Sequence, residues 1–379
     1  MQPRSDVLDA LAPAAVRSRR ILLSYASEYD TGEGIHWARV LRRLGHRVHD
    51  VNIAGPSRPA AGRLVGRGYP SDVTIHELLD EVGGADLFLY LEPMGIVPRG
   101  LESAPIPTAC MLSDTHRNPR ARRLIASLFD HVVVYHRNHL AAYQDRRPGT
   151  AHWIPYACDT DVVRDLGLPR ETDVAFVGRL YTRERRRIVR ALTGRCRLAA
   201  ARTYRQDEIP EVYSRAKIVI DLPPGDYIPF RVFEAMSCGA MLLTRRMPSG
   251  IEALFEEGTH YEAFGGEREL VAKVDRYLRD DDARARIASN GHAAIQEHHT
   301  LARRLTDTLD TIENGPHGGA PVRAMTASAR DIAYGRVYER MGRVDSLLHL
   351  ATQAGTRRSE MAWRWYACRA VARRQLLRW

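Results

Sequence analysis

The chain of 379 residues has few cysteines, almost no lysine and no long apolar run. No stretch reaches the ~18 consecutive apolar residues typical of a membrane-spanning helix, so we expect none. The five cysteines are odd in number and scattered, and no two form a C-x-x-C pair. The first twenty residues carry acids and prolines and lack the apolar core of a signal peptide. These absences argue against a disulfide framework or a zinc site and predict reduced thiols in a cytoplasmic protein.

Positive charge is concentrated near the C-terminal end, and arginine carries almost all of it. Lysine occurs only at Lys217 and Lys273. Residues 321–379 hold twelve arginines against four acidic residues, which gives this stretch a net charge of +8 out of +10 for the chain. Guanidinium groups favour phosphate and carboxylate partners. A bias toward arginine also arises from genome composition, so charge alone does not establish an anionic ligand.

The first 155 residues alternate strand-like apolar runs with helix-like segments. A buried strand at 20–26 is followed by a polar turn that contains glycine and by a helix at 35–44. Further strands are expected at 46–53, 85–91, 107–112 and 131–135. Asn118 and Pro119 predict a helix start, because proline is favoured at the first helical position. This alternation predicts a doubly wound parallel sheet.

The alternation restarts after about residue 155. The sequence predicts strands at 173–177, 216–222 and 240–244, and helices at 183–192, around 234–239, at 267–278 and at 282–298. We therefore expect an α/β chain with two Rossmann-like domains, residues 1–155 and 156–314. Ligands of such sheets bind at the carboxyl ends of the strands, so the cleft between the domains is the expected site.

A turn-rich segment at 313–321 marks the start of a basic extension, residues 315–379. Two helices are expected in it, at 331–350 and 359–377. Its arginines occur together with aromatic residues, namely Trp363, Trp365, Tyr366 and Trp379. This combination suits nucleic acid, a membrane interface or an anionic acceptor. The apolar stripe of the same helices equally suits a hairpin that docks on the second domain or forms a dimer.

The segment 226–244 joins a polar loop, a helix start and a buried strand. Backbone N–H groups at such a helix start can bind a diphosphate. Glu234, one turn into the helix, can accept hydrogen bonds from both hydroxyls of a ribose. It can equally be an exposed or capping side chain, and the spacing leaves both possibilities open.

Residues 231–244 resemble the R-x-F-E-A-x-x-x-G-x-x-x-L-T signature of spore-maturation-type glycosyltransferases, a bacterial branch of the GT-B superfamily. Further landmarks follow in the same order over about residues 107–300: SDTH, WIPYACDTD, DVAFVGRLYTRER, YSRAKIVIDL, EALFEEGTHYEAF and HHT. The first hundred residues share only the general layout, and nothing after 315 belongs to the pattern. The resemblance implies a GT-B glycosyltransferase with a nucleotide-sugar donor, first of all a UDP-sugar, and no further cofactor.

The resemblance also implies which residues of the signature hold the donor. Glu234 takes the second position of an E-x7-E motif and is expected to hold the ribose, with Phe230 and Arg231 beside it in the donor site. Asp226 occupies the first position, one methylene shorter than the usual Glu, and implies a sugar contact.

A second donor segment follows from the same resemblance. Gly178 and Arg179 fit a turn that supplies a diphosphate ligand, with Arg183 or Arg185 as a second cation. A solvated basic helix face is the alternative for these arginines.

Three further features belong to the expected cleft of the first domain. Asp114 and His116 follow a buried strand and can act as a base or orient a sugar hydroxyl, although Asp114 can also simply cap a turn. The turn with Thr31, Gly32 and Gly34 would let an acceptor or a phosphate approach the backbone closely.

The expected chemistry stabilises the charge that develops on the leaving phosphate, through the arginines and the helix start. No D-x-D motif occurs where a metal site would require one, so we expect no metal; the resemblance implies retention of anomeric configuration. Three functions remain open from the sequence. They are a glycosyltransferase with a small-molecule, glycan or protein acceptor, a glycosyltransferase of modified DNA that uses the arginine-rich tail, and a non-catalytic protein that binds sugar nucleotides or nucleic acid.

Overall fold

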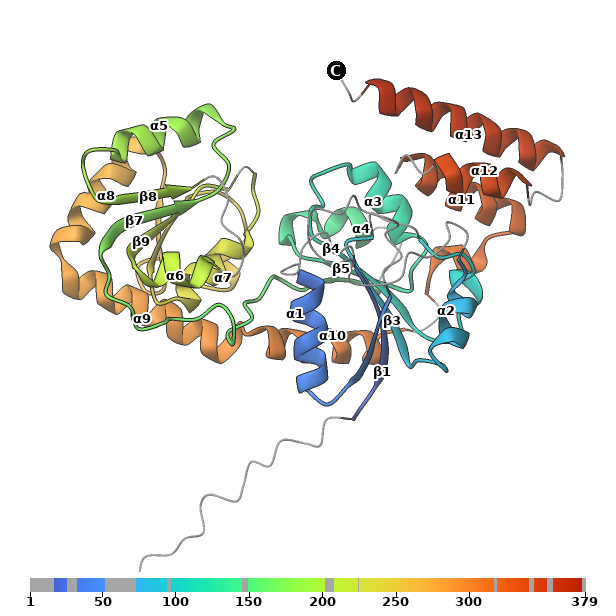
Figure 1. Ribbon diagram of the computed structural model, residues 1–379, viewed down its shortest axis with the longest axis horizontal. Coiled ribbons are helices and arrows are strands. Elements are labelled where there is room, and N and C mark those ends of the chain that lie inside the picture. Colours follow the sequence, from blue (N-terminus) through green and yellow to red (C-terminus); the bar gives the residue numbers. More distant parts are fainter. Residues whose placement is uncertain are drawn as a thin grey trace, which may run out of the picture.

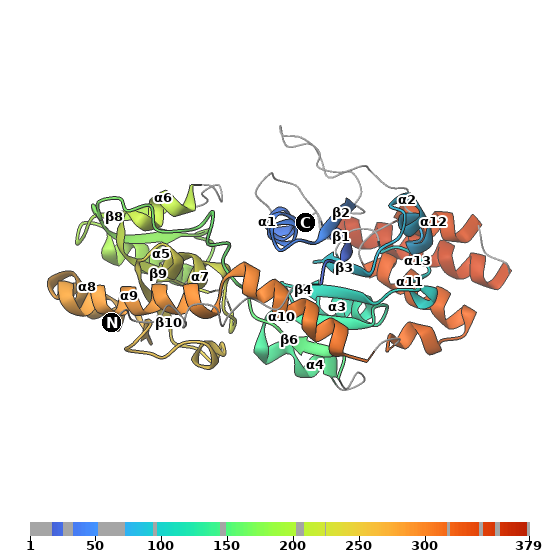
Figure 2. The ribbon, with the colours of Figure 1, turned by 90° about the horizontal axis from the view of Figure 1, so that it is seen from below.

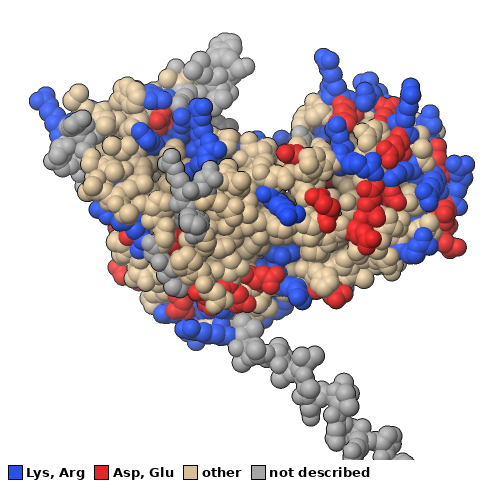
Figure 3. All heavy atoms as spheres, turned by 180° about the vertical axis from the view of Figure 1, so that it is seen from behind, with Lys and Arg blue, Asp and Glu red and all other residues tan. Residues whose placement is uncertain are grey.

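Two α/β domains and a C-terminal helical region make up the computed structural model (Figure 1). The structure describes residues 17–25, 33–51, 73–93, 97–144, 149–201, 208–223, 225–316, 319–340, 344–352 and 357–376. From behind, the molecule shows two lobes with a notch between them (Figure 3).

The first domain is built on a six-stranded sheet in the order β2-β1-β3-β4-β5-β6, and all of its strand pairs are parallel. Its strands are β1 (Arg20–Tyr25), β2 (Arg47–Val51), β3 (Leu87–Leu91), β4 (Thr108–Leu112), β5 (His131–Val134) and β6 (Ala151–Trp153). Three of them, β3, β4 and β5, are buried along their whole length. Because helices cover both faces of the sheet, these central strands consist almost entirely of apolar residues.

Five of the described helices pack on this sheet. Four belong to the first domain, and the fifth comes from the end of the second domain. The four are α1 (Glu33–Arg43), α2 (Ile75–Glu81), α3 (Pro119–Ala126) and α4 (Ala141–Gln144), and the fifth is α10 (Leu301–Asn314). Helix α3 begins as expected, with Asn118 at the N-cap position and Pro119 as its first residue. Helix α10 lies against α1, and Glu313 near its end pairs with Arg19 at the start of the first sheet. The chain therefore returns from the second domain to the first before the C-terminal region begins (Figure 2).

The second domain contains a five-stranded parallel sheet in the order β11-β10-β9-β7-β8. Its strands are β7 (Thr172–Val177), β8 (Leu198–Ala201), β9 (Ala216–Asp221), β10 (Met241–Arg245) and β11 (Glu262–Phe264). Its helices are α5 (Arg183–Leu192), α6 (Ile209–Ser214), α7 (Phe230–Ser237), α8 (Glu267–Arg279) and α9 (Asp281–His298). The two parallel-sheet domains confirm the fold class that the strand–helix alternation predicts.

The C-terminal region is helical but docks on the first domain, which corrects the expectation of docking on the second. It contains α11 (Ala327–Arg340), α12 (Val344–Thr352) and α13 (Arg357–Leu376), so the first expected helix is divided in two. Helix α11 contacts α3. Tyr334, Val337 and Trp363 lie in one apolar core with Phe88 of β3 and Phe129 at the end of the α3 segment. The apolar stripe of the tail is thus core of the first domain.

Buried polar contacts fix this docking. The carboxylate of Asp130, fully buried, accepts hydrogen bonds from Arg323 Nε at 2.8 Å and Nη2 at 2.9 Å. The hydroxyl of Tyr338 donates to the carbonyl oxygen of Val97 at 2.7 Å. Over the described ranges, no helix has the length and apolar character to cross a membrane.

Candidate functional site

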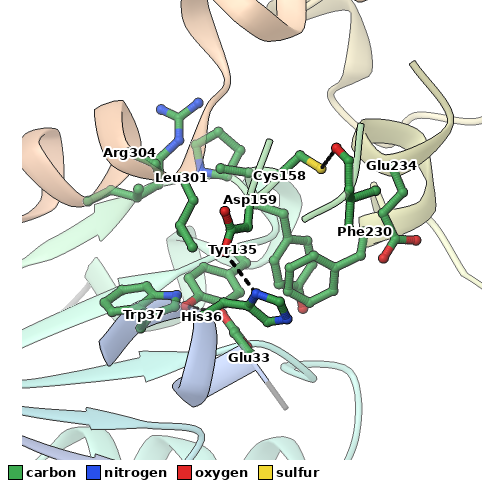
Figure 4. A pocket seen from close by; sticks show the side chains of 15 residues that line it. Glu33, His36, Trp37, Tyr135, Cys158, Asp159, Phe230, Glu234, Leu301 and Arg304 are labelled. Carbon is green, nitrogen blue, oxygen red and sulfur yellow. Dashed lines mark hydrogen bonds and ion pairs between the residues drawn. The ribbon is translucent and has the colours of Figure 1, made fainter. Parts of the chain in front are cut away.

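A cavity of about 300 Å³ lies between the two domains (Figure 4). Its walls come from α1, the end of β5, the chain segment that links the domains, α7 and α10. It is lined by Glu33, His36, Trp37, Tyr135, Ile154, Pro155, Tyr156, Ala157, Cys158, Asp159, Val163, Phe230, Glu234, Leu301 and Arg304. Most of these side chains are apolar, and the few polar ones converge on the same space, which is the usual character of a small-molecule site.

Glu234 reaches this cavity from the second turn of α7. Burial raises the pKa of its carboxyl to about 7, against the opposing charges of Arg231 and His36. The N-cap residue of α7 is Pro229, whose side chain makes no capping hydrogen bond. In the first helical turn, the Val232 N–H donates to the carbonyl oxygen of Pro229 at 3.2 Å, whereas the N–H groups of Phe230 and Arg231 have no partner among the described residues and are left for another acceptor. Phe230, also in this turn, packs its ring on Tyr156 of the linking segment at 3.8 Å between centroids.

Gly178 and Arg231 meet where β7 ends. Arg231 Nε lies 3.1 Å from Oδ1 of the fully buried Asp221, and its Nη1 donates to the carbonyl oxygen of Val177 at 3.2 Å. A Cβ atom on Gly178 would lie 3.1 Å from Arg231 Nη1 and 3.3 Å from the ring of Phe176. Glycine leaves room here for the guanidinium to pass close to the backbone, and any larger residue would press on it. Arg231, expected among the donor ligands, thus has its contacts within the protein and fixes this turn.

The other arginines of the segment divide into one buried and two exposed side chains. Arg185 is buried and donates to the carbonyl oxygens of Leu222 and Arg179, which makes it a support for the turn. Arg179 and Arg183 are exposed. Neither forms an ion pair with any residue that the structure describes. Arg179 and Arg183 are therefore the cations of this segment that remain available to an anionic ligand.

In the first domain, Glu92 organises the loop that carries Asp114. It follows β3 with a left-handed backbone (φ 43°), which is uncommon for a residue other than glycine. Its Oε2 accepts hydrogen bonds from the Ser113 N–H at 2.7 Å and from the Ser113 hydroxyl at 2.8 Å. Its other oxygen pairs with the buried Arg122 of α3. The side chain of Asp114 in turn pairs with Arg117 at 3.2 Å.

His116 and Asp226 come from different domains but lie at one contact between them. The imidazole of His116 stacks on the ring of Tyr227 at 4.8 Å. Asp226 Oδ1 lies 4.0 Å from His139 Nε2, and its carbonyl oxygen accepts a hydrogen bond from Asn138 Nδ2 at 3.1 Å. Asp114 and His116, expected as base or orienting groups, and Asp226, expected as a sugar contact, thus sit around this contact and are not among the residues that line the cavity.

The turn expected to admit an acceptor lies mostly outside the described residues, because Thr31 and Gly32 are among those not described. Gly34 lies in the first turn of α1, where a Cβ atom would collide with the ring of Tyr25 at 2.1 Å. Next to it, Glu33 is partly buried and accepts a hydrogen bond from the Tyr135 hydroxyl at 2.8 Å. Burial raises the pKa of Glu33 to about 7.

The sequence did not single out Glu33, His36 or Asp159, although all three line the cavity. Glu33 and His36 are three residues apart in α1 and therefore share one helix face. Glu33 lies within the glycine-bearing turn and His36 follows it, so this spacing could have indicated them. Asp159 lies in the WIPYACDTD landmark, and only the fold shows that it contacts His36. Among the described side chains, no group of three or more His, Cys, Asp or Glu residues could hold a metal ion.

The fold and part of the sequence resemble known glycosyltransferases. Residues 170–310 match a family model described as glycosyl transferase-like. No curated protein matches the chain. Three solved structures have a similar fold, and in each case the match covers 78% of this chain and 99% of the other chain. They are sucrose-phosphate synthase from Thermosynechococcus elongatus (15% identity, TM-score 0.53), Anabaena Alr3699/HepE in complex with UDP-glucose (15%, 0.54) and T4 phage BGT in complex with UDP and Mn2+ (12%, 0.53). The chain has the GT-B fold.

Proposed function

We propose that this protein is a glycosyltransferase that moves a sugar from a nucleotide-sugar donor, first of all a UDP-sugar, to an acceptor. The observation that carries the proposal is the position of Glu234, at a cavity between two GT-B domains and one turn into a helix with an uncapped start. The family match of residues 170–310 and a neighbour of the same fold bound to UDP-glucose support it.

In this proposal the second domain holds the nucleotide. The Glu234 carboxylate accepts hydrogen bonds from the two ribose hydroxyls, which requires an ionised side chain. Arg179 and Arg183, both exposed beside the Gly178 turn, pair with the diphosphate. The N–H groups of Phe230 and Arg231 at the start of α7 add to this anion site.

The same groups stabilise the leaving diphosphate, whose negative charge grows as the sugar bond breaks. We propose that these cations suffice and that the reaction proceeds without a metal, although a neighbour of the same fold is described with UDP and Mn2+. Turnover in EDTA, compared with turnover in added Mn2+, tests this point. A strict requirement for Mn2+ would overturn it.

The first domain supplies the groups that face the sugar and the acceptor. We assign this role to Asp114 and His116, with Asp226 across the domain contact, and place the acceptor near the turn that ends at Gly34. We propose that the anomeric configuration is retained: the new bond forms on the face that the phosphate leaves, and the leaving phosphate takes the proton of the acceptor hydroxyl. The anomer of the first product formed, observed by NMR, tests retention.

Thermal-shift measurements with UDP-, GDP-, TDP- and ADP-sugars test the donor assignment, because a ligand that binds the native state raises its stability. We expect one UDP-sugar to raise Tm in the wild type, and Glu234→Gln or Arg179→Gln to reduce that shift strongly. Glu297→Gln and Arg190→Gln, which change exposed residues elsewhere in the second domain, are the matched controls. If Glu234→Gln and Arg179→Gln bind every donor as the wild type does, the donor site lies elsewhere.

A further inference from the structure

A second and larger hollow lies on the first domain, outside the cavity described above. It has a volume of about 1270 Å³ and runs between α3 and α4 on one side and α11 and α13 on the other. Small-molecule pockets typically measure about 300–1,000 Å³. This groove is therefore larger than a nucleotide sugar needs, and a chain-like ligand fits it better.

Arginines line both walls of the groove. Arg120 and Arg123 come from α3, Arg336 and Arg340 from α11, and Arg369 from α13. Among the described residues of the lining, the only acidic one is Glu339, and it pairs with Arg369 at 3.1 Å. The lining therefore has an excess of positive charge that suits an anionic ligand.

Three of these arginines have no counter-charge among the residues that the structure describes. Arg120, Arg123 and Arg336 are exposed and form no ion pair with any residue in the described ranges. Arg120 and Arg123 are three residues apart, so they lie on one face of α3. The loop that leads into α3 carries His116 at the contact between the domains. The basic face of α3 thus leads from that contact into the groove.

Aromatic side chains accompany the charge. Trp365 is 53% exposed and lines the groove next to Tyr366, at 5.2 Å between ring centroids. The guanidinium of Arg369 lies over the Trp365 ring at 4.4 Å. An exposed aromatic surface flanked by arginines binds single-stranded nucleic acid, because bases stack on the ring while the guanidinium groups pair with phosphates.

We propose that this groove binds single-stranded nucleic acid and that α3 directs the bound strand toward the catalytic cleft. A membrane surface or a duplex fits less well, because both would contact a convex face and not a hollow between helices. Binding of the strand by the groove does not depend on the proposed enzymatic function. The part of the proposal that makes the strand an acceptor rests on the proposed glycosyltransferase function.

Fluorescence anisotropy of the full-length protein with a fluorescein-labelled 20-nucleotide single-stranded DNA, and separately with the RNA of the same sequence, tests this proposal. We expect at least one of the two to bind. The triple variant Arg120→Gln, Arg123→Gln, Arg336→Gln should weaken binding about tenfold or more. The slope of log affinity against log salt concentration should fall by about 2, as expected for three lost phosphate contacts. Trp365→Ala should weaken binding about fivefold or more, since stacking is lost.

The matched control removes three exposed arginines from the second domain, as Arg190→Gln, Arg268→Gln, Arg286→Gln. It loses the same charge and should keep most of the affinity. Equal losses of oligonucleotide affinity in the two triple variants would show a diffuse attraction to positive charge and would overturn the proposed binding site. So would the absence of binding to either oligonucleotide, or groove-dependent binding only to vesicles of 30% phosphatidylserine in phosphatidylcholine.

The groove variants are also tested for donor binding by thermal shift. Because their substitutions lie outside the donor site, their response to a UDP-sugar should equal that of the wild type. Loss of oligonucleotide binding with an intact donor response supports the groove. If the wild type binds the oligonucleotide but no nucleotide sugar, the proposed enzyme fails while the groove stands.

Discussion

His36 on α1 donates a hydrogen bond from Nδ1 to Asp159 Oδ2 at 2.9 Å, which ties the first domain to the segment that enters the second. Asp159 also pairs with Arg39 of the same helix. The opposite ring nitrogen of His36, Nε2, is buried and has no hydrogen-bond partner among the described residues. Both side chains line the cavity that holds Glu234. A donor bound there would meet a polar atom from each domain.

The titration of His36 tests this arrangement. Burial lowers the pKa of His36 below its ordinary 6.5, and the charge of Arg39 lowers it further. We expect Arg39→Gln to raise this pKa toward 6.5, as observed by NMR of the imidazole. Arg43 also belongs to α1, but it pairs with Asp161. Arg43→Gln should therefore change the pKa of His36 much less. Equal shifts of the His36 pKa in the two variants would contradict the position of Arg39 beside His36.

The affinity for donor should depend on pH through Glu234. Burial raises its pKa to about 7, and only the ionised carboxylate can accept from both ribose hydroxyls. Binding of a UDP-sugar should therefore strengthen as pH rises from about 6 to 8, with release of a proton on binding at the lower pH. Isothermal titration in buffers of different ionisation enthalpy measures both effects. In Glu234→Gln the pH dependence should disappear, and its persistence would exclude Glu234 as its source.

Docking of the tail should depend on the Asp130–Arg323 pair. We expect Arg323→Ala to lower the free energy of unfolding by about 3–5 kcal/mol, because it leaves a buried carboxylate without its counter-charge. Urea denaturation measures this loss. Arg330→Ala, which removes a guanidinium 3.9 Å from Glu102 at a more exposed position, should cost less than about 1 kcal/mol.

The same pair should leave a signature at low pH. Burial tends to raise the pKa of Asp130, but the hydrogen bond and charge of Arg323 outweigh it and hold the pKa below 3.8. Its contribution to stability is therefore present above pH 3.8 and is lost as pH falls through the lower, folded-state value. Unfolding curves between pH 5 and 2 should show a smaller acid-induced loss in Arg323→Ala than in the wild type.

Gly178→Ala should weaken donor binding through Arg231. The new methyl group would press on the guanidinium at 3.1 Å and displace the turn that leads to Arg179. We expect about a tenfold loss of UDP-sugar affinity, or ~1.4 kcal/mol, measured by isothermal titration. Gly266→Ala is the control, because a Cβ atom there meets nothing within 4 Å and its backbone is extended. Wild-type affinity in Gly178→Ala would show that this turn does not support the donor site.

The sequence by itself determined the class of fold and most of its elements. Apolar runs between helical patterns marked β1, β3, β4, β5, β7, β9 and β10, because strands buried on both faces must be apolar throughout. Asn118 and Pro119 marked the start of α3 by local chemistry that needs no tertiary context. Glu234 was singled out because it lies in a contiguous motif.

The tertiary structure alone decided which distant residues meet. Glu33, His36 and Asp159 share one cavity only because α1 and the linking segment pack together, and nothing local in their sequence encodes that contact. The apolar stripe of the tail indicated that these helices are buried, but it did not indicate which surface covers them. The Asp130–Arg323 pair fixes the tail on the first domain. Arg231 and Arg179 were both expected to be donor ligands from the sequence. In the structure, Arg231 pairs with the buried Asp221, whereas Arg179 is exposed. Burial and pairing are properties of the folded arrangement, because each depends on residues far apart in the chain.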